Sequence, residues 1–340
     1  MMKKQIIILL SFFICSISYS QKELDSDQFY SDQTPMEIKL NYSNKDMKKK
    51  TNDSTYIKTE LVYNYQNEWK TIPVELRARG NFRRAKCYFP PIKMKMKKSN
   101  YKNTIFDGNK KTKLVLPCRE ENEKNDNIMQ EFIAYKIYEI ISPYHFKTRR
   151  VNVEFTEPKG KKSKTFSLKG FIIEDDSKLE KRFAGRVVEQ FVHPMAMQGK
   201  ASVQHAMFQY MIGNTDFSVA YQHNGKLLYN SKDFIPLPYD FDMTGWVDPS
   251  YGFGNPTLNL NSLTDRMYRG FKRDDALMNE VKDQFIDAKD EIVSLVNSFK
   301  SEFDSPSEFN KMYKFMTDFF DILEDDGKFN KMVIAKARTK

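Results

Sequence analysis

The chain has 340 residues, of which 40% are hydrophobic and 29% charged, and its formal net charge is +10 at pH 7. This balance permits a sizeable buried core and excludes a disordered, collagen-like or coiled-coil protein. Thirteen glycines and thirteen prolines are too few for a low-complexity chain, and no internal repeat is visible. A chain of this length predicts two domains or one two-lobed unit.

The first twenty residues have the pattern of a secretory signal peptide. Lys3 and Lys4 form a positive start, residues 6–17 are a short apolar run, and Ser18 and Ser20 are small residues at the usual −3 and −1 positions. The pattern predicts export to the periplasm, the cell envelope or the medium, with cleavage near Ser20. No later segment reaches about 18 apolar residues, so we expect no transmembrane span in the mature chain.

The mature chain would keep two cysteines, Cys87 and Cys118. In an oxidising compartment they can pair and close a loop of about 30 residues, worth about 3 kcal/mol by loop entropy. The sequence alone leaves open whether they are bonded. There is no CxxC pair and the four histidines are scattered, so zinc ligation is not expected.

Positive charge is densest in the first third of the mature chain. A basic surface favours phosphate groups, anionic lipids or acidic partners. Most of these lysines are better explained as a solvated lysine-rich surface. The basic residues do not follow one helix or an aromatic platform, and no nucleic-acid-binding motif is present, so nucleic acid is not an expected partner.

Alternation of apolar and polar residues predicts strands through the first half of the chain. In Ile92-Lys93-Met94-Lys95-Met96 the apolar side chains face one way and the lysines the other. One helix is expected in this half, over residues 127–141, with Asp126 as its N-cap. The predicted strands cover residues 36–40, 56–63, 72–79, 92–96, 114–116, 150–155 and 166–173.

From Leu179 onward the pattern becomes mainly helical. A helix is predicted over residues 202–212, ending at Gly213-Asn214, where a left-handed stop is favoured. Two short strands follow at 226–229 and 235–239, and further helices are predicted over 277–299 and 307–323. Strands that crowd the first half and helices that crowd the second predict an α+β, two-lobed arrangement.

Carboxylates in two segments are the first candidates for chemistry. Asp216 lies just beyond the predicted helix ending at Gly213, where the negative helix end gives a carboxylate no stabilisation. It therefore suits binding a metal or accepting a hydroxyl proton. Asp240 and Asp242 follow a buried strand, and on an extended stretch both would face one side while Phe241 points to the core. That pair predicts a Mg²⁺ or Mn²⁺ site.

Two further segments can meet a phosphate. In residues 76–84 a strand runs into Gly80 and then arginines, which can bring backbone N–H groups and guanidinium forks to an anion. Lys93 on a central strand and Glu131 on the next helix can form an ion pair that holds the ammonium over a phosphate. Periodicity alone does not choose these residues, and three others compete for the same roles: Lys95, Lys97 and Glu139.

Together these segments resemble the CotH-type atypical kinases, a family named for a spore-coat kinase, and in particular their exported Bacteroidetes-like branch. The resemblance covers about residues 70–250, in the family's order. It runs through Arg77-Ala78-Arg79-Gly80-Asn81, Pro90-Pro91-Ile92-Lys93-Met94-Lys95, the helix containing Glu131, Gly170-Phe171-Ile172-Ile173-Glu174-Asp175, Gly213-Asn214-Thr215-Asp216 and Pro238-Tyr239-Asp240-Phe241-Asp242.

The resemblance implies a protein-kinase-like two-lobed fold, with a strand-rich N-terminal lobe at residues 21–174 and a helical C-terminal lobe at 175–340. It implies transfer of phosphate from ATP or another nucleotide, with Mg²⁺ or Mn²⁺, to Ser or Thr of an exported or cell-envelope protein. Asp216 would be the catalytic residue. The nucleotide would be bound by Lys93, Glu131, Arg79 and Glu174, and the metal by Asp240, Asp242 and Asn224.

The chain departs from ordinary protein kinases at two places. Tyr221 stands five residues after Asp216, where those enzymes have a metal-binding asparagine, and the next asparagine is Asn224. A glycine-rich phosphate lid is absent, with only Gly80 in its place. A second hypothesis is therefore that the protein is a catalytically silent binding or scaffold protein of the cell envelope. A third hypothesis is another metal-assisted transfer, such as nucleotidyl transfer or hydrolysis.

Overall fold

The structure is a computed structural model that describes residues 28–80, 82–121 and 124–339. The predicted signal peptide at residues 1–20 lies outside these residues. Within them, no helix combines the length and the apolar composition needed to cross a bilayer.

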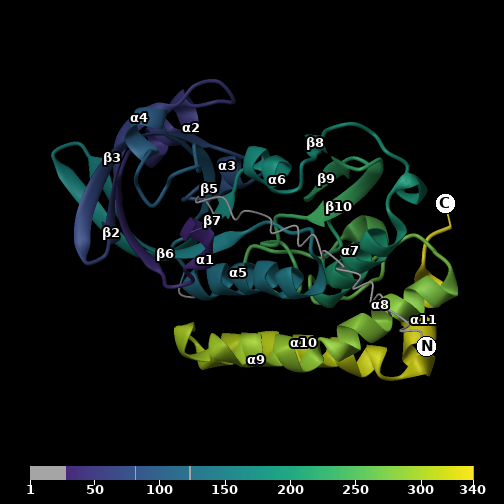
Figure 1. The fold of residues 1–340 in the computed structure, drawn as a ribbon. Coiled ribbons are helices and arrows are strands. Elements are labelled where there is room, and N and C mark those ends of the chain that lie inside the picture. The colour runs from purple at the N-terminus through teal and green to yellow at the C-terminus, as the bar shows by residue number, and fades with distance from the viewer. Residues whose placement is uncertain (1–27, 81, 122–123, 340) are drawn as a thin grey trace, which may run out of the picture.

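Seven strands of the first half form a closed barrel in the order β1-β2-β3-β4-β5-β7-β6 (Figure 1). Neighbouring strands are antiparallel except at the closure, where β1 runs parallel to β6 and pairs Met36 with Val151. The strands are β1 (Met36–Asn41), β2 (Ile57–Tyr65), β3 (Glu68–Ala78), β4 (Ile92–Lys95), β5 (Lys111–Val115), β6 (Thr148–Lys159) and β7 (Lys162–Glu174).

The predicted protein-kinase-like two-lobed fold, with a strand-rich first lobe and a helical second lobe, is wrong. The first half closes into a barrel and contains helices between its strands, and the second half has a sheet of its own. Alternation in the sequence identifies strands from neighbouring residues. It does not show that Met36 and Val151, 115 positions apart, pair and close the sheet. The domain boundary after residue 174 stays a prediction.

The interior of the barrel is apolar because alternate residues of each strand face inward. On β4 the side chains of Ile92 and Met94 are fully buried, while Lys93 and Lys95 on the opposite face are partly exposed. The same alternation on neighbouring strands buries Leu76 and Leu114. The barrel therefore has a core of its own, and its outer face is free to carry the charged side chains described below.

Short helices lie before and between the strands of the barrel in sequence. One long helix, α5 (Lys124–Ile141), lies against β7 and β6. The helix begins three residues before the predicted start, and Asp126 is not its N-cap. Its carboxylate is buried and accepts the backbone N–H groups of Asp304 and Ser305, at 2.7 and 3.0 Å. This contact ties α5 to the C-terminal helices. The short helices are α1 (Gln28–Ser31), α2 (Asn44–Lys50), α3 (Phe82–Lys86) and α4 (Lys98–Tyr101).

The second half combines a three-stranded antiparallel sheet, ordered β10-β9-β8, with helices. Its strands are β8 (Arg186–Val188), β9 (Gly225–Asn230) and β10 (Asp233–Pro238). Its α-helices are α6 (Asp176–Arg182), α7 (Gly199–Met211), α8 (Asp275–Asp287), α9 (Lys289–Ser298), α10 (Pro306–Leu323) and α11 (Asp326–Met332). Short 3-10 turns occur at Pro194–Ala196, Pro256–Leu258, Lys300–Glu302 and Ile334–Lys336.

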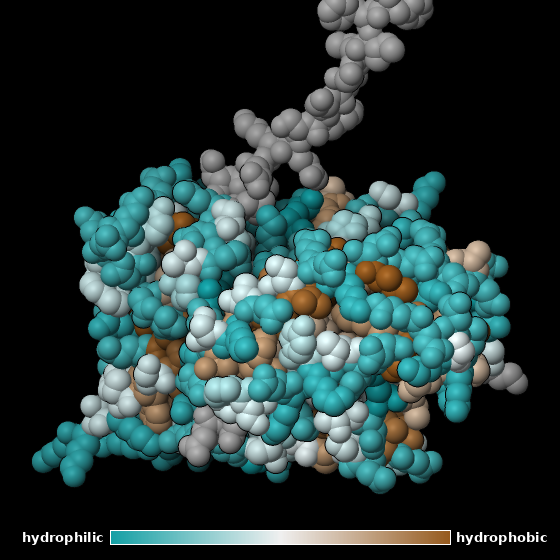
Figure 2. Space-filling view, turned by 90° about the horizontal axis from the view of Figure 1, so that it is seen from below, coloured by the Kyte–Doolittle hydropathy of each residue, from teal (hydrophilic) through white to brown (hydrophobic). Residues whose placement is uncertain are grey.

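The C-terminal helices form a layer below α5 (Figure 1). Their apolar stripes face inward and join α5 and α7 in one large core, in which Phe285, Phe319 and Phe320 are fully buried. From below, the molecule presents a mainly hydrophilic surface with small, separate apolar groups (Figure 2). These helices therefore support the second half of the molecule, and the candidate site residues lie outside them.

Candidate functional site

The segment after β10 carries Asp240 and Asp242 on a turn rather than on extended chain. Asp240 has a φ of 63°, a left-handed conformation that is costly for a residue with a side chain. Its backbone N–H donates to the hydroxyl of Tyr135 on α5, 3.1 Å away, which holds the turn. Phe241 is fully buried, as predicted. The two carboxylates meet because the chain turns at Asp240.

Both carboxylates converge on the guanidinium of Arg83, on α3. Its Nη1 lies 3.3 Å from Asp240 Oδ1, and its Nε lies 3.4 Å from Asp242 Oδ2, an ion pair without hydrogen-bond geometry. Nη1 also lies 3.5 Å from Glu131 Oε2 on α5, and Nη2 donates to the carbonyl of Leu116 at 3.2 Å. We call Arg83, Glu131, Asp240 and Asp242 the Arg83 cluster.

The Arg83 cluster has more negative than positive charge in a buried place. Burial raises the pKa of Glu131 to about 8, and the attraction of Arg83 does not offset it. Burial also raises the pKa of Asp242, with repulsion from Asp240 adding to the effect. Only Asp240 is partly exposed, with 30% of its side chain open to solvent. Glu131 is therefore largely protonated at neutral pH, and the charges of Asp240 and Asp242 are met by Arg83 and the nearby Arg79. Asp240 is the carboxylate of the cluster that a further cation can reach.

The predicted metal ligands do not all come together. The side-chain amide of Asn224 donates to Asp216, to its carbonyl at 2.7 Å and to Oδ2 at 3.3 Å. Among the residues that the structure describes, no group of three or more His, Cys, Asp or Glu side chains is arranged to hold a metal ion. Asp240 and Asp242 still suit Mg²⁺, which proteins often hold with one or two carboxylates while phosphates and water supply the other ligands.

Asp216 lies on an exposed loop that follows α7. Gly213 ends this region of helix with a φ of +63°, and the ring of Phe315 approaches it so closely that a Cβ would clash. Asp216 Oδ1 lies 3.2 Å from His223 Nε2, and 58% of the Asp216 side chain is exposed. Ser218 and His223 exchange backbone hydrogen bonds of 3.0 Å, which fold the loop back on itself. The carboxylate is thus oriented and remains accessible.

The Asp216 segment and the Asp240–Asp242 segment lie side by side. The backbone N–H groups of Gly245 and Trp246 donate to the carbonyls of Gly213 and Ile212, at 3.3 and 3.0 Å. A loop over residues 249–255 connects them a second time. In it the Tyr251 hydroxyl donates to Asp242 Oδ2 at 3.4 Å, and the Asn255 amide donates to the Thr215 carbonyl at 3.3 Å.

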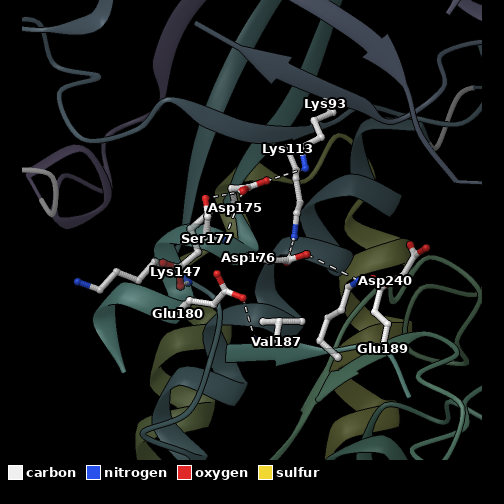
Figure 3. A network of polar contacts seen from close by, with 12 residues as sticks. Lys93, Lys113, Lys147, Asp175, Asp176, Ser177, Glu180, Val187, Glu189 and Asp240 are labelled. Atoms are coloured by element: carbon white, nitrogen blue, oxygen red, sulfur yellow. Dashed lines mark hydrogen bonds and ion pairs between the residues drawn. The ribbon is translucent and has the colours of Figure 1, made fainter. Parts of the chain in front are cut away.

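The predicted ion pair between Lys93 and Glu131 does not form. Lys93 Nζ lies 2.9 Å from Asp175 Oδ2, just beyond β7, whereas Glu131 contacts Arg83. The predicted pairing fails because Arg83 on α3 forms the ion pair with Glu131. The sequence had indicated Arg83 only as part of a basic segment. Lys113 on β5 makes a parallel contact with Asp176. Figure 3 shows both lysines reaching from the barrel strands toward the start of α6.

These ion pairs change the acidity of the carboxyls. Burial favours the neutral form of Asp175, but Lys93, Ser177 and Lys113 outweigh it and lower the pKa of Asp175 to about 2. Ser177 Oγ donates to Asp175 Oδ1 at 2.7 Å. The pKa of Asp176 is also lowered, because Lys113 and Lys226 outweigh burial. Both carboxyls are therefore charged at neutral pH and hold the lysines in place.

Arg79 lies in the same area. Its guanidinium stacks over the ring of Tyr239, with 5.4 Å between the Cζ atom and the ring centroid, and Lys113 Nζ lies 4.8 Å from the same centroid. Burial acts to lower the pKa of Arg79, but attraction to Tyr239 and then to Asp240, the next residue, outweighs it and the pKa is raised. Arg79 and the buried Lys113 therefore meet at Tyr239, the residue before Asp240, while Lys93 lies at Asp175. The sequence singled out Lys93 and Arg79 but not Lys113.

Glu174 does not present its carboxylate to a ligand. The side chain is fully buried, accepts the N–H of Lys147 at 2.8 Å, and forms an ion pair with Arg182 on α6. Burial raises the pKa of this carboxyl in spite of Arg182. Its contacts join the end of β7 to α6, so the predicted nucleotide-binding role of its side chain is not supported by where it lies.

Cys87 and Cys118 form a disulfide, which answers a question that the sequence left open. The bond lies close to Arg83. The N–H of Cys87 donates to the carbonyl of Arg83 at 2.9 Å, and the carbonyl that accepts from Arg83 Nη2 belongs to Leu116, two residues before Cys118. The disulfide therefore anchors α3, which carries the central guanidinium, to the chain that leaves β5.

Neither a known protein-family model nor a curated protein matches this sequence.

Proposed function

We propose that this protein is an exported CotH-like atypical kinase that transfers phosphate from ATP or another nucleotide to Ser or Thr of an exported or cell-envelope protein. The proposal rests on the side chains and does not use the two-lobed fold, which the barrel replaces. The observation that supports it is the pair of backbone hydrogen bonds from Gly245 and Trp246 to Gly213 and Ile212, which join the chain shortly after Asp242 to the chain shortly before Asp216. A proton acceptor and an acidic cation site thereby belong to one region.

Asp216 is the proposed catalytic residue. In the transfer, the hydroxyl oxygen of the acceptor bonds to the terminal phosphorus, the bond from that phosphorus to the nucleoside diphosphate oxygen breaks, and the hydroxyl proton passes to the Asp216 carboxylate. Contacts from His223 and Asn224 orient the carboxylate, while its exposure lets a protein hydroxyl approach. Positioning of this kind supplies much of a kinase's rate.

Lys93, Lys113 and Arg79 are the proposed contacts for the phosphates of the nucleotide. Arg79 and Lys113 lie at Tyr239 and Lys93 lies at Asp175, and cationic side chains of this kind suit anionic oxygens. Mg²⁺ or Mn²⁺ is the proposed metal, with Asp240 and Asp242 as the protein ligands. When bound, the ion would neutralise charge on the phosphates.

A catalytically silent binding or scaffold protein of the cell envelope is the second candidate. It is favoured by the Arg83 guanidinium, which contacts both proposed metal ligands and already supplies a positive charge to them. The contact of Asn224 with Asp216, away from those ligands, points the same way. In this alternative Arg83 is a permanent internal counter-ion.

The test is label transfer from terminally labelled ATP with Mn²⁺, to the protein itself and to exported proteins. Asp216→Asn should reduce transfer at least about a hundredfold, the lower range for removing a general base. Asp233→Asn, at an exposed aspartate that starts β10, is the matched control and should keep full transfer. Absence of transfer in the wild-type protein, together with no nucleotide-dependent rise in melting temperature, would favour the silent alternative. Saturating nucleotide at a hundred times its Kd stabilises by about 2.7 kcal/mol.

A further inference from the structure

Exposed large apolar side chains lie on segments that contact the Asp216 loop. Scattered single examples are normal on a soluble surface, but a group of them marks an interaction site. Four of the six large hydrophobic residues that are exposed in the described part of the chain lie on segments joined to the Asp216 loop. These four are Phe191 (59% exposed), Met195 (45%), Tyr221 (73%) and Phe253 (64%). We call them the apolar rim.

Two members of the apolar rim form an aromatic pair. Tyr221 lies five residues after Asp216, at the tip of the loop that Ser218 and His223 close. The ring of Tyr221 lies 5.3 Å from the ring of Phe191, centroid to centroid. The N–H of Val192 donates to the carbonyl of Ala220, at 3.4 Å, which holds the two segments together. An exposed aromatic pair thus lies at the tip of the loop that begins with Asp216.

Phe253 lies on the loop over residues 249–255. It belongs to the loop in which Tyr251 contacts Asp242 and Asn255 contacts the carbonyl of Thr215, the residue before Asp216. Nothing within this loop requires an exposed phenylalanine, and its flanking glycines Gly252 and Gly254 make close backbone contacts that keep the loop compact. Exposed apolar residues therefore lie on two segments that are hydrogen-bonded to the chain around Asp216.

Arginines lie next to the apolar rim. Arg273 donates to the carbonyls of Pro194, Met195 and Met197, and Arg269 donates to those of Thr215 and Phe217. Arg338 lies near enough to Arg269 to lower its pKa, after burial as the larger cause. Within the described residues, none of these three arginines forms an ion pair with a carboxylate, but the charge of Asp216 attracts Arg269 and acts to raise its pKa. Asp216 therefore compensates part of the charge of Arg269.

A small cavity opens among these groups. It measures about 20 Å³, which is room for one water-sized group, and its lining includes Arg269, Arg273, Ser202 and His205. His205 is almost completely buried, and its Nδ1 has no hydrogen-bond partner. Burial lowers the pKa of His205 to about 3, so the ring is neutral at neutral pH. The cavity can take one oxygen of an anionic group.

We infer that the apolar rim and the neighbouring arginines bind the acceptor protein, and that the segment they recognise combines a large apolar residue with acidic residues near the Ser or Thr. The apolar residue packs on Phe191 and Tyr221. The acidic residues meet Arg273 and Arg338, which form no ion pair with a carboxylate of the described residues. This inference rests on the proposed function for the meaning of Asp216, but the binding it describes needs neither nucleotide nor turnover.

The experiment measures peptide binding by fluorescence anisotropy, with the full mature chain and without nucleotide or metal. The first peptide is short and carries a serine, a phenylalanine and several aspartates. The second replaces the aspartates with lysines, and the third replaces the phenylalanine with alanine. The first should bind at least about tenfold more tightly than each of the others, and its affinity should fall as salt is added.

Variants locate the binding surface. Phe191→Ala and Tyr221→Ala should each weaken the first peptide about tenfold, since exposed aromatic anchors carry much of such contacts. Arg338→Gln, at an exposed side chain, should weaken it several-fold and reduce the salt dependence. Trp69→Ala is the matched control, because Trp69 is an exposed aromatic residue on the barrel, with 51% of its surface open to solvent. This variant should bind the first peptide with the wild-type affinity.

Three results would overturn the inference: no binding of the acidic peptide at millimolar concentration, equal binding of the acidic and basic peptides, or an equal loss in Trp69→Ala. The proposed function fails separately. If label transfer is absent while the acidic peptide binds and Phe191→Ala weakens it, the docking surface stands and the kinase proposal is lost. If label transfer occurs and the protein binds the three peptides equally, the kinase proposal stands and the docking surface is lost.

Discussion

The two acidic regions of this protein have opposite environments. Glu131, Asp240 and Asp242 surround the buried guanidinium of Arg83, whereas Asp216 stands on an exposed loop with His223 and Asn224. A buried carboxylate must be neutralised by a partner or by a proton, so its first contribution is to the fold. An exposed carboxylate makes little difference to stability and is free for chemistry. The difference predicts which substitutions affect folding and which affect activity.

The largest effect on stability is expected for Arg83→Met. The change leaves three carboxylates around an apolar side chain, and breaking a buried ion pair in this way costs about 3–5 kcal/mol. The measurement is the free energy of unfolding by urea at pH 8. Arg186→Met, at an exposed arginine on β8, is the control and should differ from wild type by less than about 0.5 kcal/mol. Unchanged stability of Arg83→Met would show that another cation holds the carboxylates.

The same variant should depend on pH in a predictable direction. The pKa values of Glu131 and Asp242 are already raised in the folded protein, so the folded state binds protons more readily than the unfolded state. Raising the pH above the ordinary carboxyl range therefore costs stability, and more so without Arg83. The stability gap between wild type and Arg83→Met should be smaller at pH 5 than at pH 8. A gap that widens toward pH 5 would contradict this account.

A smaller loss is expected when the disulfide is removed. The bond closes a loop across 31 positions, and replacing both Cys87 and Cys118 by serine should cost about 2–4 kcal/mol. Because the bond anchors α3, the backbone amides around Arg83 should also exchange hydrogen faster, which hydrogen-exchange mass spectrometry measures. The amides of α10, far from the bond in sequence and in another core, are the internal control. Equal changes in both places would mean a global effect rather than a local one.

Lys93→Met should have a smaller effect on the free energy of unfolding than removal of the disulfide. The folded-state pKa of Asp175 is about 2, below its ordinary value, so its stabilising contribution is present above about pH 4 and is lost as the pH falls toward 2. Without Lys93, burial dominates and the pKa of Asp175 should rise, which carbon-detected NMR titration follows. Lys95→Met, on the same strand and pairing with Glu75, is the matched control and should leave the Asp175 titration unchanged.

The smallest effect on stability belongs to the most important residue for the proposed activity. Asp216 is more than half exposed, and Asp216→Asn keeps a side chain that can accept from Asn224, so the free energy of unfolding should change by less than about 0.5 kcal/mol. Thermal and urea unfolding measure this directly. A loss above about 2 kcal/mol would place Asp216 among the residues of the fold and would erase the contrast with the Arg83 cluster.

The sequence by itself determined the local elements and several of the residues worth testing. Alternation on β4 predicted which side chains are buried, and the glycine at 213 predicted the end of α7, because both depend only on neighbouring residues. The juxtaposition of the Asp216 and Asp240 segments was proposed from a resemblance, and their direct backbone bonds are consistent with it.

The tertiary structure alone decided the barrel and the partners of the charged groups. The barrel closes by pairing of β1 with β6. Arg83 on α3 forms an ion pair with Glu131, and Lys93 forms one with Asp175. Such choices depend on which buried charge lies nearest in space, and burial makes a wrong pairing costly by several kcal/mol. Spacing along the chain contains no information about that distance, so ion pairs between residues more than forty positions apart had to be seen in the folded molecule.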